Sequence, residues 1–137
     1  MFRETHSVLV VDDVNDWRIT IRGLLQDEGY RVQVAETAEE ALAFLEADRF
    51  DLAVIDIRLD ETNEDDTEGI TLAENIYLQW PEVRIIIITG YDTSGTLDKA
   101  MKPTPTGRLV HDYILKKDTH THLLPTIRQA LNEPANL

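Results

Sequence analysis

The sequence predicts an α/β domain in which five strands alternate with five helices, a (βα)5 doubly wound parallel sheet. Short apolar runs rich in Val and Ile recur along the 137 residues, as in strands that are buried on both faces. Apolar residues between these runs recur at helical spacing, and such alternation is typical of parallel sheets covered by helices. No internal repeat or low-complexity linker interrupts the pattern. We therefore expect a single domain over residues 1–137, with its core at about 7–131 and no output domain.

Five segments have the apolar character of strands. The first, Val-Leu-Val-Val at 8–11, is stopped by two aspartates, and the third, at 50–57, is also nearly all apolar. The second alternates apolar and polar residues, as a half-covered strand does. The fourth contains four consecutive isoleucines, and the fifth is brief. In chain order the predicted strands are Val8–Val11, Tyr30–Ala35, Phe50–Ile57, Val83–Ile88 and Tyr113–Leu115.

Helices are predicted between and after these strands from apolar spacing and end signals. Thr37 followed by Glu40 resembles a capping box at a helix start, and Gly29 and Pro81 are typical of helix ends. A short helix is expected near 96–101. Pro125 lies inside the last apolar pattern, so that this helix either starts late or is bent. The predicted helices cover about 17–28, 37–45, 70–80, 96–101 and 123–131.

The composition restricts the class of protein. Thirteen basic residues against 26 acidic ones give a formal net charge of −13, which argues against direct binding to nucleic acid or anionic membranes. Cysteine is absent, which excludes disulfides and thiolate metal sites. The N-terminus lacks the apolar segment of a signal peptide, and no run approaches membrane-spanning length. We expect a cytoplasmic protein.

Polar residues follow four of the predicted strands. Asp12 and Asp13 follow the first, Asp56 ends the third, Thr89 follows the fourth and Lys116 follows the fifth. Parallel strands bring these ends to one edge of the sheet, where ligands bind in such folds. Three converging carboxylates form the oxygen-rich site that Mg²⁺ prefers. A lysine opposite them can neutralise a phosphoryl group, and a threonine hydroxyl can donate to one.

These residues resemble a known family over nearly the whole chain. Asp12-Asp13, Asp56 after the third strand, Thr89-Gly90 after the fourth and Tyr113-x-x-Lys116 at the fifth are similar to the receiver domain of two-component response regulators. The resemblance implies a flavodoxin-like fold with strand order 2-1-3-4-5. It also implies a signalling switch rather than an enzyme that turns over a diffusing substrate.

The resemblance assigns a role to each carboxylate. Asp56 is the implied nucleophile and phosphoacceptor, which takes a phosphoryl group from a phosphohistidine or a small phosphodonor. Asp13, Asp56 and the backbone carbonyl of Arg58 are the implied direct ligands of Mg²⁺ (or Mn²⁺), and Asp12 acts largely through water. The implied chemistry is limited to self-phosphorylation and autodephosphorylation.

The resemblance also implies how the switch works and what it contacts. Lys116 pairs with the bound phosphoryl group, Thr89 moves toward it, and Tyr113 turns inward into the vacated space. This movement alters a protein-interaction surface. The implied partners are a sensor histidine kinase or phosphotransfer protein and a downstream effector protein or domain, and a homodimer formed on phosphorylation is also allowed.

Some positions depart from the family pattern. Asp60 stands where receivers usually carry a proline, and Gly69, the matching glycine, comes several residues late after an acidic run at 60–68. Lys117 stands where many receivers have a proline with a cis bond. The simpler interpretation of the acidic run is a solvated insertion. The more specific one is that its charge slows the entry of anionic phosphodonors or selects a basic partner.

Three other functions compete with a phosphoryl-accepting switch. A diverged receiver could act as an interaction module without phosphate, although the intact set of site residues argues against this. A flavodoxin-like cofactor binder would need a Ser/Thr/Gly-rich phosphate loop where Asp12 and Asp13 stand. A metal-dependent phosphatase would usually carry a second acid two residues after its nucleophile, where Arg58 stands.

Overall fold

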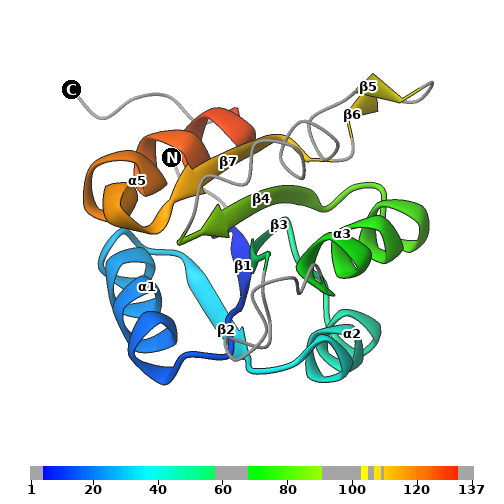
Figure 1. The fold of residues 1–137 in the computed structure, drawn as a ribbon, viewed down its shortest axis with the longest axis horizontal. Helices are drawn as coiled ribbons and strands as arrows, with labels where there is room; N and C mark the ends of the chain where they lie inside the picture. Colours follow the sequence, from blue (N-terminus) through cyan, green and yellow to red (C-terminus); the bar gives the residue numbers. More distant parts are fainter. Residues whose placement is uncertain (1–4, 58–67, 91–102, 105–106, 109, 133–137) are drawn as a thin grey trace.

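A five-stranded parallel sheet organises the described part of the chain (Figure 1). The computed structural model describes residues 5–57, 68–90, 103–104, 107–108 and 110–132. The sheet has the order β2-β1-β3-β4-β7, which confirms the predicted order 2-1-3-4-5 with β7 as the fifth strand. Its strands are β1 (Ser7–Val11), β2 (Arg31–Ala35), β3 (Leu52–Asp56), β4 (Arg84–Thr89) and β7 (Asp112–Leu115).

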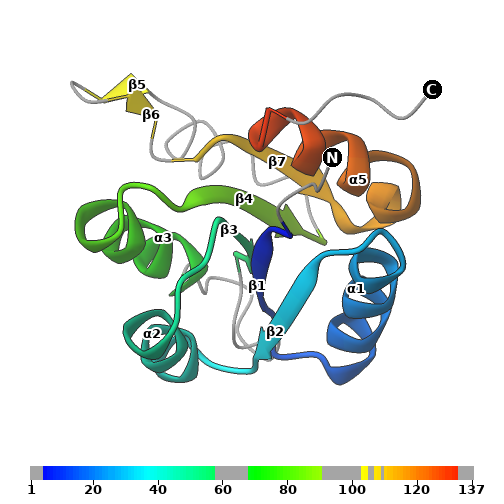
Figure 2. The same ribbon diagram turned by 180° about the vertical axis from the view of Figure 1, so that it is seen from behind.

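Two layers of helices cover the sheet, as both ribbon views show (Figures 1 and 2). Helices α1 (Asn15–Asp27) and α5 (Thr119–Ala130) lie on one face, and α2 (Ala38–Ala47) and α3 (Glu68–Gln79) lie on the other. Because side chains alternate along a strand, each strand contributes to both cores. In β1, Val8 and Val10 pack with α1 and α5, whereas Leu9 and Val11 pack with α2 and α3. The apolar runs are therefore buried on both sides.

The helix ends follow the chemistry of their sequences. Thr37 accepts a hydrogen bond from the Glu40 N–H at 3.1 Å, and the Glu40 carboxylate accepts one from the Glu36 N–H at 3.3 Å. The predicted cap of α2 is thus present, with Glu40 reaching one residue further back than in a standard capping box. Helix α5 begins at Thr119, ahead of Pro125, so the late start considered for this helix is wrong.

The connection before β7 contains a small additional element. Strands β5 (Pro103–Thr104) and β6 (Gly107–Arg108) pair antiparallel, apart from the main sheet. The prolines and glycine there predict interrupted structure, which fits the two-residue strands. The expected short helix at 96–101 lies outside the described residues.

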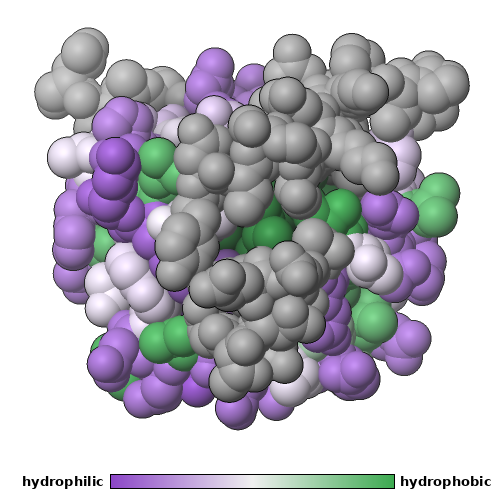
Figure 3. All heavy atoms as spheres, in the orientation of Figure 1, coloured by the Kyte–Doolittle hydropathy of each residue, from purple (hydrophilic) through white to green (hydrophobic). Residues whose placement is uncertain are grey.

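The surface that the structure describes is mostly polar. In the orientation of Figure 3, hydrophilic residues dominate the margin of the visible face. The large apolar side chains that are exposed are Ile19, Leu78 and Tyr113. Among the described helices, none is both long and apolar enough to cross a membrane.

Candidate functional site

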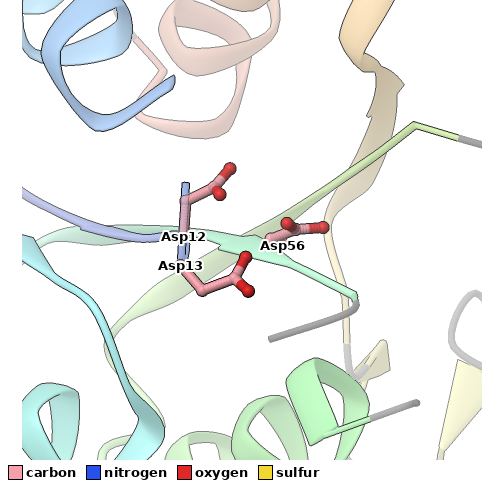
Figure 4. A group of neighbouring side chains, drawn as sticks. All are labelled: Asp12, Asp13 and Asp56. Atoms are coloured by element: carbon pink, nitrogen blue, oxygen red, sulfur yellow. The ribbon is translucent and has the colours of Figure 1, made fainter. Parts of the chain in front are cut away.

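Strand register brings the predicted carboxylates together. Val11 of β1 lies beside Ile55 of β3, so that the next residues, Asp12 and Asp56, are neighbours at the carboxyl edge of the sheet. Figure 4 shows Asp12, Asp13 and Asp56 gathered where β1 and β3 end. One carboxylate oxygen from each lies within 4.8 Å of the others. Asp12 and Asp56 are 0% and 2% exposed, and Asp13 is partly buried.

Backbone contacts hold Asp12 at the start of α1. Its carboxylate accepts a hydrogen bond from the Val14 N–H at 2.9 Å, and its backbone carbonyl accepts one from the Arg18 guanidinium at 2.7 Å. Its own N–H donates to the Ala35 carbonyl at 3.1 Å, which extends the pairing of β1 with β2 beyond the strand. These contacts tie Asp12 to α1 and to β2. Arg18 is a residue that the sequence did not single out, because no local motif marks it.

Lys116 lies between two of the carboxylates. It follows β7 in a 3-10 turn, and its ammonium lies 3.0 Å from Asp56 Oδ2 and 3.1 Å from Asp12 Oδ2. The Thr119 hydroxyl donates to the Lys116 carbonyl at 2.7 Å and so supports this turn. The lysine is 9% exposed. The predicted proximity of Lys116 to the acidic edge is therefore confirmed.

Burial and charge act in opposite directions on the site. Burial lowers the pKa of Lys116, but the negative charges of Asp56 and Asp12 outweigh it, and the net shift is upward. Lys116 therefore stays cationic. Burial raises the pKa of Asp12 above its ordinary value of 3.8, and the Val14 hydrogen bond and the Lys116 charge offset only part of this. The site thus concentrates more negative charge than one lysine neutralises.

Gly69 fixes the start of α3 against the backbone of the candidate acceptor. Its N–H donates to the Ile57 carbonyl at 2.8 Å. A Cβ added at Gly69 would overlap the backbone oxygen of Asp56, so no side chain can be placed there. Only glycine allows this approach. The glycine that arrives late in the sequence therefore lies directly beside Asp56 in space.

One aromatic residue contacts the lysine. The Lys116 ammonium lies over the Trp17 ring, 5.2 Å from its centroid. Trp17 comes from the first turn of α1 and packs on the core between α1, α5 and the sheet. Its helical spacing predicts a packing role, and the contact with Lys116 was missed because 99 positions separate the two residues in the chain.

The remaining predicted site residues differ in their placement. Thr89 ends β4 beside Leu115 and is buried at the same edge as Asp56. Tyr113 lies outside the buried cluster, with its side chain 41% exposed. Arg58, whose carbonyl is a predicted ligand, and all of the acidic run except Glu68 lie outside the described residues. All described peptide bonds are trans, so the bond before Lys117 is trans.

The cluster fits a hard divalent cation. Three carboxylates can each offer an oxygen, and oxygen ligands suit Mg²⁺ and Mn²⁺. Two of these carboxylates are almost fully buried, where uncompensated negative charge is unfavourable. A bound cation would neutralise the negative charge of the carboxylates that Lys116 does not compensate.

Comparisons with known proteins agree with this arrangement. A sequence profile described as "response regulator receiver domain" matches residues 8–128. The chain is 33% identical to the nitrogen assimilation regulatory protein NtrX of Azorhizobium caulinodans over 92% of this chain and 26% of that protein. It is 36% identical to the alginate biosynthesis regulator AlgB of Pseudomonas aeruginosa over 69% of this chain and 20% of that protein. The chain thus spans a fifth to a quarter of the length of these relatives.

A solved structure shares the fold over nearly its whole length. A CheY-like receiver domain protein from Methanospirillum hungatei superimposes with a TM-score of 0.80 at 30% identity, covering 94% of this chain and 95% of that one. The profile match covers most of the chain, and it includes all three carboxylate positions and Lys116. This chain belongs to the response regulator receiver domain family.

Proposed function

We propose that Asp56 is the phosphoacceptor of this receiver domain. The observation that carries the proposal is the pairing of its Oδ2 with the Lys116 ammonium at 3.0 Å inside a cluster of three carboxylates. An Asp56 oxygen attacks the phosphorus of a phosphohistidine, the new O–P bond forms, and the P–N bond breaks. The histidine nitrogen keeps the electron pair of that bond and takes up a proton.

Asp12, Asp13 and Asp56, with the backbone carbonyl of Arg58, would hold Mg²⁺ or Mn²⁺. When bound, the metal offsets negative charge on the carboxylate and the phosphoryl oxygens. The carboxylate cluster supports this assignment. A response regulator from Thermotoga maritima, TrrA, has been solved in complex with Mg²⁺ and BeF; it is 25% identical, with a TM-score of 0.73 over 92% of this chain and 99% of that one.

Three residues would carry the change that follows phosphorylation. Lys116 transfers its ammonium from the Asp56 carboxylate to the phosphoryl group, which it can follow on its flexible stem. Thr89, buried at the same edge, donates its hydroxyl to another phosphoryl oxygen. Tyr113 starts from an exposed position, outside the buried cluster, and turns inward. The chain's own residues thus perform phosphorylation and the later hydrolysis.

The partners of the domain follow from this chemistry. The phosphodonor is a sensor histidine kinase or a phosphotransfer protein, and the exchange takes place in the cytoplasm. The switched surface then acts on an effector protein or on a domain of the same polypeptide, since the relatives are much longer than this chain. Phosphorylation-linked homodimerisation belongs to the same proposal.

Intact mass spectrometry after incubation with acetyl phosphate and Mg²⁺ tests the acceptor. We expect one phosphoryl group on the wild type and none on Asp56→Asn. Asp51→Asn is a matched control, because Asp51 also adjoins β3 but lies at its opposite end, where it accepts the Ser7 N–H at 2.9 Å. This control should be phosphorylated normally. A folded wild type that gains no mass and does not bind beryllofluoride would instead indicate a phosphate-independent interaction module.

A further inference from the structure

The Lys116 ammonium has an aromatic partner in addition to its two carboxylates. It lies 3.0 Å from Asp56 Oδ2, 3.1 Å from Asp12 Oδ2 and 5.2 Å from the centre of the Trp17 ring. A cation over an indole face within about 6 Å is attracted by the ring, and the attraction grows when water is excluded. Because the lysine is only 9% exposed, this contact belongs to the stronger class.

The two kinds of partner respond differently to phosphorylation. On the proposed function, Lys116 moves from Asp56 Oδ2 to an oxygen of the phosphoryl group that Asp56 acquires. A hydrogen bond to a carboxylate weakens steeply with misalignment. An aromatic face attracts the cation as a whole and does not require one aligned hydrogen bond, so it tolerates a displacement of the cation across it. The indole can therefore stabilise the ammonium both before and after it moves.

Trp17 is fixed well enough to serve as such a support. It lies in the first turn of α1, directly after the segment that Asp12 anchors through Val14 and Arg18. Its ring also packs against the core beneath α1 and α5, so that it does not have to be ordered when Lys116 moves.

We propose that Trp17 is a positioning residue for Lys116, holding the ammonium over the carboxylate pair and guiding it to the phosphoryl group. This inference rests on the proposed function of Asp56 and adds a residue to it. Trp17 touches neither the phosphoryl group nor the metal in this role and acts only through Lys116.

The test compares Trp17→Phe, which keeps an aromatic face, with Trp17→Leu, which fills space without one. The rate of phosphorylation by acetyl phosphate with Mg²⁺ should fall about three- to tenfold in Trp17→Leu and less in Trp17→Phe. Trp80→Leu is the matched control, since Trp80 is also partly buried but packs on the opposite core, with α2 and α3. It should leave the rate unchanged. Equal rates in the Phe and Leu variants would overturn the inference.

A double-mutant cycle separates positioning from simple packing. In a Lys116→Met background, Trp17→Leu should cause no further loss of rate, because the group through which it acts is gone. An equal fold loss in both backgrounds would identify Trp17 as a packing residue and overturn the inference. Failure of the wild type itself to accept phosphate would instead overturn the function of Asp56, whatever the Trp17 variants do.

Fluorescence keeps the inference testable if Trp17→Leu does not fold. In the Trp80→Phe protein, Trp17 is the sole tryptophan. Its emission should change when Lys116→Met removes the adjacent charge, and also when beryllofluoride and Mg²⁺ draw the ammonium away from Asp56. Emission that is unchanged by Lys116→Met in the folded protein would overturn the contact itself.

Discussion

The interior of the sheet and its carboxyl edge are built on opposite principles. The buried positions within β1, β3 and β4 up to that edge are all apolar, mainly Val and Ile. Among the described residues, the buried polar or charged ones all lie at the carboxyl edge of the sheet, in the turn that follows it or at the start of α5. They are Asp12, Asp56, Thr89, Lys116 and Thr119.

The contrast separates what stabilises the fold from what performs its chemistry. Apolar burial contributes about 25 cal/mol per Å² and needs no partner of special geometry. Buried carboxylates are unfavourable unless cations compensate them, and Lys116 compensates only in part. On the proposed function, the edge therefore serves phosphoryl chemistry at some expense of stability. Three predictions test this division.

Removal of the metal should change the free energy of unfolding more than the other changes do. The change should depend only on residues at the carboxyl edge of the sheet. At a Mg²⁺ concentration 100 times its Kd, binding to the folded state raises the free energy of unfolding by about 2.7 kcal/mol. Urea unfolding with Mg²⁺ or with EDTA measures this gain. Asp13→Asn should lose most of it, whereas Asp51→Asn should keep it. An undiminished gain in Asp13→Asn would place the metal elsewhere.

Two glycines, one at the edge and one on the exposed side of a helix, test how tightly the edge is packed. Gly69→Ala would force a Cβ against the Asp56 carbonyl, and overpacking of this kind costs about 1–3 kcal/mol. Gly23, inside α1, has open space around its added Cβ, so Gly23→Ala should stabilise the protein by about 0.5–1 kcal/mol. Thermal or urea unfolding of both variants measures the difference. A neutral Gly69→Ala would show that α3 can move away from Asp56 at little cost.

Neutralising Asp12 should give the smallest effect, with a distinctive pH dependence. Because the folded-state pKa of Asp12 is raised, mainly by burial, the folded protein binds the proton more tightly than the unfolded chain does. Stability from this group is then present below pH 3.8 and is lost as the pH rises through the folded-state pKa.

Asp12→Asn should accordingly be more stable than the metal-free wild type at pH 7, because it removes a buried charge whose burial raises the pKa of the carboxyl group. The advantage should shrink toward pH 4, and saturating Mg²⁺ should reverse it. Urea unfolding in EDTA at several pH values provides the measurement, with Asp51→Asn as the control. A variant less stable than the wild type at pH 7 would mean that the Lys116 contact outweighs the burial of the charge.

The strands could be predicted because the spacing of their apolar residues reflects how far each face of the strand is covered by helices. The apolar runs predicted at 50–57 and 83–88 match β3 and β4 to within two residues. The alternating run at 30–35 matches β2, which lies at the edge of the sheet. Helix α5 was harder, because Pro125 forbids one backbone hydrogen bond, a loss that packing of Leu123 and Ile127 on the sheet can offset.

Only those site residues that follow the ends of strands could be predicted from the sequence. Parallel order places Asp12 and Asp56 side by side in any such sheet, and a lysine after the last strand reaches them. The contact of Trp17 with Lys116 depends on how α1 tilts, and the fit of Gly69 against Asp56 depends on where the chain returns after residue 67. No local pattern encodes either, because both arise from packing between distant segments.

The close approach of Gly69 to Asp56 also makes the receiver tolerant of a change in chain length between Ile57 and Gly69. The chain leaves the sheet at Ile57 and is held again at the same place, where the Gly69 N–H meets the Ile57 carbonyl at 2.8 Å. Whatever lies between begins and ends at a shared anchor, and doubling the length of such a segment costs only about 0.6 kcal/mol. A recognition peptide or reporter could be grafted after Arg58, the proposed metal ligand, and would then lie next to the proposed acceptor without altering the scaffold that holds it.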